Sequence, residues 1–450
     1  MKMKSILLSM LAIATLASCN KDENLVASTG EETYAGISVA FPKLATRAVT
    51  ADENATTEEQ AVESLGVYVV GADGTLHSKV FPKAEFEEGA GNYYQLKAAL
   101  KTTTGDKNIF VVLNPTAEVS AAIGAKRTVA FGENEYQLTA DKFMTTTSMV
   151  MSSTKAKSVT LEVQDNSTAL AQPIHVSVQR NLAKVAVLSK NGSSGTFTTS
   201  AGHTVKGLEF ASITLAKNSY LIQQLNVAGD PISLANIKTP GMSYVFPPGP
   251  SPIANDYWNT VVAPTVYDDV MEAPATAAPK SYNAFYALEN INTKNVVGNT
   301  TAAIIKANVT LKSGVVVTAY DTTTGSRDIG TLAEGNTFYV KLSDNTVWSE
   351  AGYNNAVVAG GAYSLTAADF SKPYVGGVSY YRIWVKDSNS AIGIIRNNYY
   401  IMQINNITGI GLPEVPGTVV DPETPVEDDT YIAVTVEVLA WNIENSEHNL

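Results

Sequence analysis

The sequence has almost none of the residues from which cross-links and metal sites are made. Its 450 residues include one cysteine, Cys19, and four histidines. One cysteine cannot form an intramolecular disulfide, so stability must come from packing. The histidines lack the close spacing to other His, Cys or carboxylate ligands that a zinc site needs; they are His77, His175, His203 and His448. We therefore expect no metal and no cofactor.

Catalytic motifs are missing as well. The sequence contains no G-x-G-x-x-G and no P-loop. The stretch Gly192 to Gly195 (GSSG) fits a flexible hairpin turn and not the nucleophile elbow of a hydrolase. The acidic residues between Asp421 and Asp429 lack the EF-hand spacing, so solvation explains them better than calcium binding. No constellation of residues supports an enzyme.

Charge is also scarce. Charged residues make up 16% of the chain against 45% apolar residues, and the net charge is -12. Net negative charge disfavours nucleic acid as a partner, and it disfavours electrostatic adhesion to anionic lipid. Thr, Val, Ala, Asn and Gly abound, which is the profile of a stable β protein with an uncharged polar surface. The length is sufficient for two domains, each with its own core.

The amino terminus has the pattern of an exported lipoprotein. Lys2 and Lys4 precede an apolar run, Ile6 to Leu16, that is too short to span a bilayer as a mature anchor. Residues 1–18 are therefore interpreted as a signal peptide. Leu16 to Cys19 (LASC) resembles the lipobox of bacterial lipoproteins, so Cys19 is predicted to carry the acyl chains, palmitate among them. The alternative is a free cysteine at the end of an ordinary signal peptide.

A short strand follows and ends near an arginine. Tyr34 to Pro42 (YAGISVAFP) alternates with period 2, which indicates a strand with one buried face. The residues on that face are Ile37, Val39 and Phe41. The bond between Arg47 and Ala48 precedes a polar segment without strand pattern, so it is an accessible site for an Arg-specific protease. The alternative is a solvated loop arginine.

The middle of the chain predicts two β domains, residues 48–173 and 174–412. Apolar runs bounded by turn residues predict strands, and residues 116–126 predict a short helix. The predicted strands are 65–70, 93–100, 108–113, 159–163, 174–188, 208–215, 221–227, 302–311, 315–320, 337–342, 379–385 and 398–407. The Met-rich residues 143–153 are interpreted as core filling. Residues 241–278, rich in Pro, Tyr and Trp, form a long irregular excursion.

The chain ends with a strand on a tether. Residues 413–429 are rich in proline and acid and read as too extended and too polar to pack. Residues 430–450 then alternate with period 2, which gives an apolar face made of Ile432, Val434, Val436 and Val438, with Trp441 beyond them. We expect this strand to join the sheet of another copy of the protein. In the uncut chain we expect the first strand to be paired in its own sheet and the last one to be loosely placed.

Several stretches in order along the chain are similar to the fimbrillins, the major fimbrial subunits of Bacteroidetes, most closely to the minor-fimbrium shaft type of Porphyromonas. They are Arg180 to Val185 (RNLAKV), Glu289-Asn290, Gly376 to Val378 with Tyr380-Tyr381, Arg396 to Tyr400 (RNNYY) and Val436 to Trp441 (VEVLAW). The resemblance spans the whole chain.

The resemblance implies an all-β fold of two tandem transthyretin-like Greek-key β-sandwich domains with a C-terminal donor strand. It implies an outer-membrane lipoprotein precursor, touching the membrane only through its lipid, with residues 19–47 as a propeptide cut off after Arg47. Loss of the first strand would open a groove that the last strand of the next copy fills. The implied partners are further copies in a head-to-tail polymer, anchor and tip subunits, an Arg-specific protease, and host or bacterial surface ligands. The implied place is a cell-surface fimbrium that supports adhesion and biofilm formation.

Two other functions stay open. One is a tip or accessory adhesin of the same fold with residues 241–278 as its binding surface. The other is a monomeric surface lipoprotein that binds glycans. Four tryptophans could be sugar platforms, although buried tryptophans are commoner in sandwiches; they are Trp258, Trp348, Trp384 and Trp441. Arg180 and Arg396 are interpreted as charges at strand ends or between domains.

Overall fold

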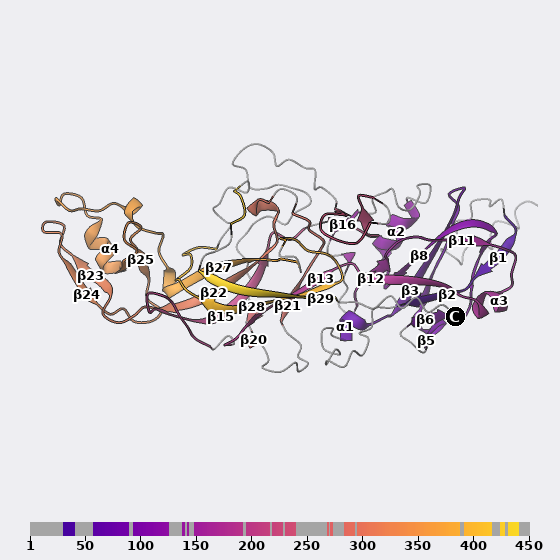
Figure 1. Ribbon diagram of the computed structural model, residues 1–450, viewed down its shortest axis with the longest axis horizontal. Coiled ribbons are helices and arrows are strands. Elements are labelled where there is room, and N and C mark those ends of the chain that lie inside the picture. The colour runs from indigo at the N-terminus through magenta and orange to yellow at the C-terminus, as the bar shows by residue number, and fades with distance from the viewer. Residues whose placement is uncertain are drawn as a thin grey trace, which may run out of the picture. The chain divides into compact units, whose positions relative to one another are not determined.

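The structure is a computed structural model of the chain, and part of the chain is described here. The described residues are 30–40, 57–89, 93–125, 137–139, 142–143, 148–191, 195–216, 218–227, 230–239, 268–269, 271–272, 283–292, 295–387, 391–415, 424–427 and 431–440. Strands dominate, helices are few and short, and the contacts divide the chain into two compact units (Figure 1). The predicted class, all-β with two β domains, is confirmed.

The first unit consists of Met1–Phe41, Ala61–Tyr136 and Thr145–Gln179. Its strands are β1 (Glu32–Ala35), β2 (Ile37–Ala40), β3 (Ser64–Gly71), β4 (Leu76–Pro82), β5 (Phe86–Gly89), β6 (Tyr93–Leu96), β7 (Leu100–Thr103), β8 (Gly105–Leu113), β10 (Met151–Ser153), β11 (Lys157–Leu161) and β12 (Ile174–Arg180). Its helices are α2 (Ala117–Ala125), α3 (Asn166–Ala171) and the 3-10 turn η1 (Lys83–Glu85). The large sheet has the order β4-β3-β8-β10-β12-β2-β6-β5, with β11 also on β8, and β1 pairs with β7.

The core of the first unit follows from its apolar strands. β3 and β8 pair antiparallel and bury their apolar runs, residues 65–70 and 109–113, because both strands have neighbours on both edges. Phe143, Met149 and Met151 are 0%, 2% and 0% exposed, so the interpretation of this Met-rich stretch as core filling is confirmed where it is described. Helix α2 lies within the predicted helix 116–126.

The second unit consists of Pro42–Gln60, Gln137–Met144 and Arg180–Leu450. Its elements are α1 (Thr57–Gln60), β9 (Gln137–Thr139), β13 (Ala183–Ser189), β14 (Phe197–Thr198), β15 (Thr204–Ile213), β16 (Asn218–Tyr220), β17 (Gln224–Leu225), β18 (Ile237–Lys238), β19 (Asp268–Asp269), β20 (Met271–Glu272), β21 (Ala284–Ala287), η3 (Val297–Asn299), β22 (Ala302–Thr310), β23 (Val316–Tyr320), β24 (Arg327–Gly330), β25 (Phe338–Val340), β26 (Val347–Ser349), α4 (Glu350–Ala356), η4 (Ala367–Asp369), η5 (Val375–Gly377), β27 (Val378–Trp384), β28 (Asn398–Ile407) and β29 (Ile432–Ala440).

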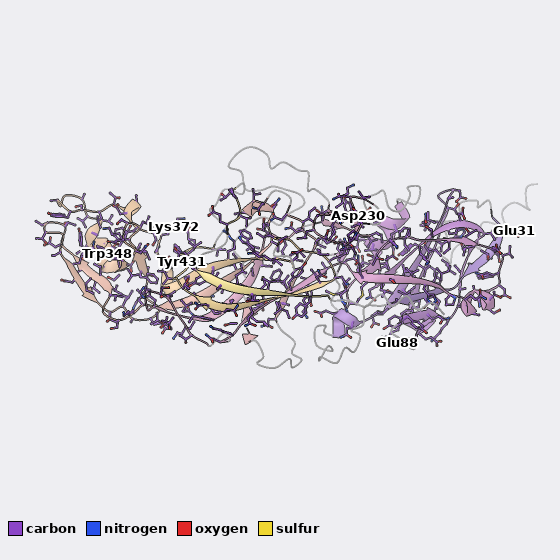
Figure 2. The ribbon with its side chains drawn as sticks, viewed as in Figure 1. Glu31, Glu88, Asp230, Trp348, Lys372 and Tyr431 are labelled. Carbon is purple, nitrogen blue, oxygen red and sulfur yellow. The ribbon has the colours of Figure 1, made fainter. Side chains whose placement is uncertain are left out.

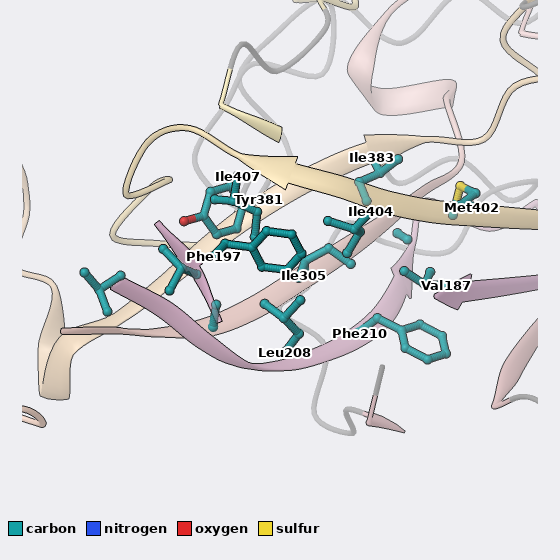
Figure 3. Close-up of a cluster of buried hydrophobic side chains, with 14 of the residues drawn as sticks. Val187, Phe197, Leu208, Phe210, Ile305, Tyr381, Ile383, Met402, Ile404 and Ile407 are labelled. Atoms are coloured by element: carbon teal, nitrogen blue, oxygen red, sulfur yellow. The ribbon is translucent and has the colours of Figure 1, made fainter. Parts of the chain in front are cut away.

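Two five-stranded sheets enclose the core of the second unit. One has the order β20-β13-β28-β29 with β21 beside β13, and the other has the order β14-β15-β22-β27 with β19 beside β15. Their inner faces form one large apolar cluster that runs through β13, β15, β22, β27 and β28. In Figure 3, Met402, Ile404 and Ile407 of β28 lie with Leu208 and Ile305 of the other sheet.

A smaller sheet with a helix forms one end of the second unit. Strands β24, β23, β26 and β25 pair in that order, and α4 packs on β23 (Figure 1). Ser349 caps α4, because its side chain accepts a hydrogen bond from the Gly352 amide, and an N-cap serine favours a helix start there. Trp348 is fully buried in a small cluster with Phe370 beneath this helix. The sequence pattern did not predict α4.

Three strand predictions are wrong in part. The predicted strand 93–100 is two strands, β6 and β7, separated at residues 97–99. The predicted strand 174–188 is two strands, β12 and β13, separated at Asn181-Leu182. The predicted strand 221–227 is irregular except for Gln224–Leu225, because polar contacts hold its start: the Leu221 carbonyl accepts bonds from Asn181 and Arg396. Long-range side-chain partners therefore override the local apolar pattern.

The close approach of helix α3 to Gly36 gives a first prediction. A Cβ at Gly36 would lie 1.9 Å from the Ala169 carbonyl oxygen, which is backbone and cannot rotate away. Gly36→Ala should therefore lower the free energy of unfolding by about 1–3 kcal/mol in urea titrations, as overpacking does.

Gly124→Ala is the matched control in the same unit. Gly124 lies inside helix α2 with nothing within 4 Å of its Cβ position, so alanine there should leave stability unchanged or raise it by about 0.5–1 kcal/mol. Equal effects of the two substitutions would contradict the tight contact at Gly36.

Candidate functional site

The first strand occupies a central slot in its sheet. β2 pairs antiparallel with β6 on one edge and parallel with β12 on the other. Ile37 and Val39 are 0% exposed, and Ser38 between them is 1% exposed, so both faces of the strand are covered. The expectation that the first strand pairs in its own sheet is confirmed. Phe41 lies outside the described residues.

Hydrogen bonds attach the residues just before β2 to the same unit. The Thr33 hydroxyl donates to the Glu162 carbonyl at 2.6 Å, and the Gln164 side chain donates to the Tyr34 carbonyl at 2.8 Å. The Gly36 carbonyl accepts from the Ile174 amide at 2.8 Å. Removal of residues 30–40 would leave the backbone groups of β6 and β12 that now face β2 without partners, and it would uncover the core beneath them.

The last strand is ordered in its own unit, so the expectation of a loosely placed tail is wrong. β29 pairs antiparallel with β28 over nine residues, with a bulge between Ile404 and Asn406 (Figure 1). The strand begins directly after Tyr431, which Figure 2 labels. Without β29, strand β28 would be an open edge of its sheet beside the main apolar cluster. The alternating strand β29 of the same chain covers that edge.

The last strand is nevertheless less buried than the first. Ile432, Val434 and Val436 are half-buried against the main cluster, whereas Ala433 and Thr435 between them are exposed. β28 is its single strand neighbour in the described part of the sheet. The alternation agrees with the predicted apolar face as far as side chains are described. For Val438 the backbone position, opposite Tyr400, is described.

The spacer before this strand also packs in part, contrary to expectation. Val426 donates its amide to the Asn295 carbonyl at 2.9 Å, and the Val297 amide donates to the Thr424 carbonyl at 2.9 Å. The Trp384 indole donates to the Glu427 carbonyl at 2.9 Å. Pro425 and Val426 are apolar residues inside an acidic stretch, and Val426 joins a small cluster around Trp384. The proline-rich and acidic composition of residues 413–429 as a whole gave no indication that residues 424–427 pack.

The two Arg-Asn pairs that stood out in the sequence lie side by side. They precede β13 and β28, which pair parallel with Lys184 opposite Tyr399. The Arg180 amide donates to the Asn397 side chain at 3.2 Å, and the Asn397 amide donates to the Leu182 carbonyl at 2.9 Å. Arg180 is the last residue of β12 and Arg396 lies just before β28, so both are at strand ends as predicted. Both side chains are buried, however, at 1% exposed.

Each buried arginine belongs to a cluster with a buried carboxylate. Arg396 forms an ion pair with Glu289 at 2.7 Å. It also donates to the Tyr220 and Leu221 carbonyls at 2.7 and 3.0 Å. The Gln223 side chain donates to the other oxygen of Glu289. Bonding of this kind is what allows a guanidinium to stay charged away from water.

The second cluster contains a residue that the sequence did not single out, Glu59 of α1. Its carboxylate accepts from Lys184 Nζ at 3.0 Å and from the Tyr286 hydroxyl, and its carbonyl accepts from Arg180 Nε at 3.2 Å. Glu59 is 1% exposed and belongs to the second unit by its contacts. Two buried cations therefore face one buried anion. A lone glutamate in a polar segment carried no signal in the sequence.

The pKa values of the two cations follow from this burial. Burial lowers the pKa of Arg180 to about 10, and the charge of Glu59 opposes that change. Burial also lowers the pKa of Lys184, again opposed by Glu59 and assisted by the charge of Arg180. The negative charge of Glu59 thus favours the charged forms of both cations.

Both tryptophans in the described residues are structural. Trp348 is fully buried and Trp384 is 2% exposed, with the Arg382 guanidinium over the Trp384 ring at 4.2 Å. Neither can stack on a sugar from solvent. Trp258 and Trp441 lie outside the described residues.

Other predicted sites also fall outside the described residues. They are Cys19, the cleavage bond between Arg47 and Ala48, and most of the excursion 241–278. Within the described ranges, no group of three or more His, Cys, Asp and Glu side chains is arranged to hold a metal ion. None of the helices in those ranges has the length and apolarity to cross a membrane.

Two protein-family models match the sequence. Residues 35–204 match the family described as major fimbrial subunit protein (FimA). Residues 372–447 match the family described as the C-terminal region of type IV major fimbrial subunit protein, fimbrillin. Together they cover more than half of the chain, and they include β2, β28 and β29. No curated protein sequence matches the chain.

Solved structures resemble this one at low sequence identity. A protein of Parabacteroides distasonis provisionally assigned to cell adhesion has a TM-score of 0.47 at 15% identity, covering 92% of this chain and 100% of its own. A fimbrilin of Porphyromonas gingivalis has a TM-score of 0.41 at 16% identity, covering 91% and 98%. The tip fimbrial protein Mfa3 of Porphyromonas gingivalis, truncated at its C-terminus, has a TM-score of 0.37 at 12% identity, covering 91% and 100%.

The Glu59 cluster yields a stability prediction. Glu59→Gln keeps the shape of the side chain but leaves Arg180 and Lys184 without their buried anion, so the free energy of unfolding should fall by about 3–5 kcal/mol. The measurement is urea unfolding followed by circular dichroism.

Glu334→Gln is the control for this prediction. Glu334 pairs with Lys206 at 2.9 Å on the exposed surface of the same unit, and such pairs contribute at most about 1 kcal/mol. If the two glutamine variants lose similar stability, Glu59 is not the required counter-ion.

Proposed function

The chain belongs to the family of major fimbrial subunit proteins, the fimbrillins, and on that premise we propose that it polymerises into a fimbrial shaft by donor-strand exchange. The family is one of structural subunits of a cell-surface fimbrium and not of enzymes. Within it, we assign the chain to the minor-fimbrium shaft type. Loss of β1 and β2 opens a slot in the first unit of one copy, and β29 of the next copy fills it.

The single observation that carries this proposal is the contrast between the two strands. β2 fills a slot with a strand on each edge and 0% exposed aliphatic side chains. β29 covers one edge, and its aliphatic side chains are half-buried. A short aliphatic strand therefore has more apolar surface to bury, and two edges to bond, in the slot of β2 than in its own sheet.

The free energy of apolar burial favours moving β29 from its own sheet into the slot of β2 in the next copy. Full burial of an aliphatic side chain such as Ile432, Val434 or Val436 is worth roughly 1.5–3 kcal/mol. Most of that is already obtained on β28, where these side chains are partly buried, so a smaller remainder, together with a second ladder of backbone bonds, drives exchange. The loss of the β29–β28 pairing opposes it, which makes the exchange conditional on an empty slot. An uncut copy, whose slot is filled, offers no such gain.

Proteolytic cleavage after Arg47 empties the slot of β2. In this proposal Cys19 carries the lipid of an outer-membrane precursor, and an Arg-specific protease cuts between Arg47 and Ala48. The cut separates residues 19–47, including β1 and β2, from the rest of the chain, and it also separates the lipid. Cleavage therefore releases the subunit from the membrane and activates it for assembly in a single step.

Head-to-tail contact then determines the form of the product. The slot lies in the first unit and the donor strand at the end of the second, so each copy offers both halves of a heterologous contact. Such a contact does not close on itself and produces a fibre. Anchor and tip subunits at its two ends complete the proposed assembly, which supports adhesion and biofilm formation.

A shaft role explains the last strand better than the alternatives. A monomeric glycan binder has no use for a tethered strand, and its sugar platforms would need exposed aromatic rings, whereas Trp348 and Trp384 are buried. A terminal anchor would lack the donor strand, and a tip or accessory adhesin is the remaining alternative. The excursion 241–278 would be the binding surface in that case.

The decisive experiment combines cleavage with deletion of the last strand. Purified full-length chain treated with a trypsin-like protease should form ladders in gels and fibres in electron micrographs, whereas untreated chain should stay monomeric. The same chain without residues 430–450 should be cut equally well and stay monomeric, because its copies have slots but no donors.

Arg47→Ala provides the control for the cut. This variant keeps both strands and should resist both processing at that bond and assembly. Fibres from the truncated chain, or monomers from fully cut wild-type chain, would contradict donor-strand exchange. A cut wild-type chain that stays monomeric and binds glycans would favour the monomeric lipoprotein.

A further inference from the structure

The first and last strands share a pattern that goes beyond alternation. β2 begins Ile37-Ser38-Val39, and β29 begins Ile432-Ala433-Val434. In both strands the first residue is isoleucine, the third is valine, and the residue between them is small. The pattern is informative because the residue between the two aliphatic side chains is exposed in one strand and buried in the other.

Ser38 lies in a confined position. It is 1% exposed, although it occupies the face of β2 opposite to Ile37 and Val39. Its hydroxyl has no hydrogen-bond partner within the described part of the chain. A buried hydroxyl without a partner is unfavourable, so a small apolar side chain would suit this position at least as well.

Helix α3 lies on the face of β2 that carries Gly36 and Ser38. Ser38 lies opposite Gln95 of β6, and the Gln95 side chain donates to the Leu170 carbonyl of α3 at 2.9 Å. The backbone of the same helix leaves no room for a Cβ at Gly36. An incoming strand without glycine must therefore begin at the position of Ile37, or turn aside just before it. Residues 430–450 contain no glycine.

Three registers bring a branched aliphatic residue of β29 to both the position of Ile37 and that of Val39. With Ile432 there, the strand begins where β29 itself begins, and Ala433 takes the place of Ser38. With Val434 there, Ala433 meets the α3 backbone and Thr435 takes the confined position. With Val436 there, a charge, that of Glu437, would be buried under α3, which is the least favourable case.

We propose that the confined position of Ser38 sets the register of the donor strand, with Ile432, Ala433 and Val434 of the next copy replacing Ile37, Ser38 and Val39. Ser38 and helix α3 thus act as a filter for the donor: a small uncharged residue must follow the first aliphatic one. This inference rests on the proposed function, and it names the specificity determinant of that contact.

The filter can be tested with a matched pair of substitutions. Ala433 and Thr435 are both exposed on β29 in its own sheet, so Ala433→Glu and Thr435→Glu should both leave the monomer folded. In the slot, residue 433 lies in the confined position, whereas residue 435 takes the place of the half-buried Ala40. Ala433→Glu should slow fibre growth of the cut chain at least ~100-fold, since a carboxylate must be moved from solvent into a buried position. Thr435→Glu should slow it much less.

Disulfide cross-linking between copies determines the register of the donor strand directly. A chain with Cys19→Ala has no other cysteine, which gives a clean background. One batch carries Gln95→Cys and a second carries Ala433→Cys or Thr435→Cys; the batches are cut, mixed and oxidised. Because directly opposed strand residues are within disulfide range, residue 95 should cross-link with residue 433 and only weakly with residue 435.

The outcomes separate this inference from the proposed function. Fibres that cross-link through residue 435, fibres without either cross-link, or equal inhibition by the two glutamates would overturn the register while leaving donor-strand exchange intact. If the unsubstituted cut chain forms no fibres, the proposed function itself is wrong. Circular dichroism of each monomer confirms that the variants are folded before cleavage.

Discussion

The first unit is stable only when a strand occupies the position between β6 and β12. β2 lies between β6 and β12 with both edges bonded and both faces covered, so neither the backbone groups nor the core beside it can tolerate its absence. A slot of this kind has only two stable states, filled by its own strand or by another. The chain carries a second strand of similar pattern, and in the proposed assembly a single cut converts a stable monomer into an assembling subunit.

In the second unit, buried ion pairs favour one arrangement of the strands. The cluster of Arg180, Lys184 and Glu59 and the pair of Arg396 and Glu289 lie where the parallel strands β13 and β28 begin. Charges in such surroundings stabilise one arrangement because every other arrangement leaves a charge unpaired. The ion pair of Glu59 with Lys184 also attaches helix α1 to the second unit. Helix α1 therefore has an attachment that does not depend on β2.

The strand pattern was predicted well wherever burial has period 2 or is continuous. β28 has the predicted bounds, and β8, β22 and β27 lie within a few residues of them. The wrong predictions lie where contacts with residues distant in the sequence determine the local structure. The residues after Leu221 looked like a strand, yet the side chains of Asn181 and Arg396 bind the carbonyl there. The acidic spacer looked unable to pack, yet Val426 and the Glu427 carbonyl meet Trp384.

The sequence by itself determined the β class, the alternating faces of the first and last strands, and the motifs that resemble fimbrillins, because these depend on residue type and spacing alone. Only the tertiary structure showed that the last strand already covers β28, that Ser38 is buried on the face of β2 opposite to Ile37 and Val39, and that Glu59 balances two buried cations. Each of these depends on which residues distant in the chain meet, and a single sequence does not encode that in its local pattern. The difference in burial between β2 and β29, on which the proposed exchange depends, is a property of neighbours and not of the strands themselves.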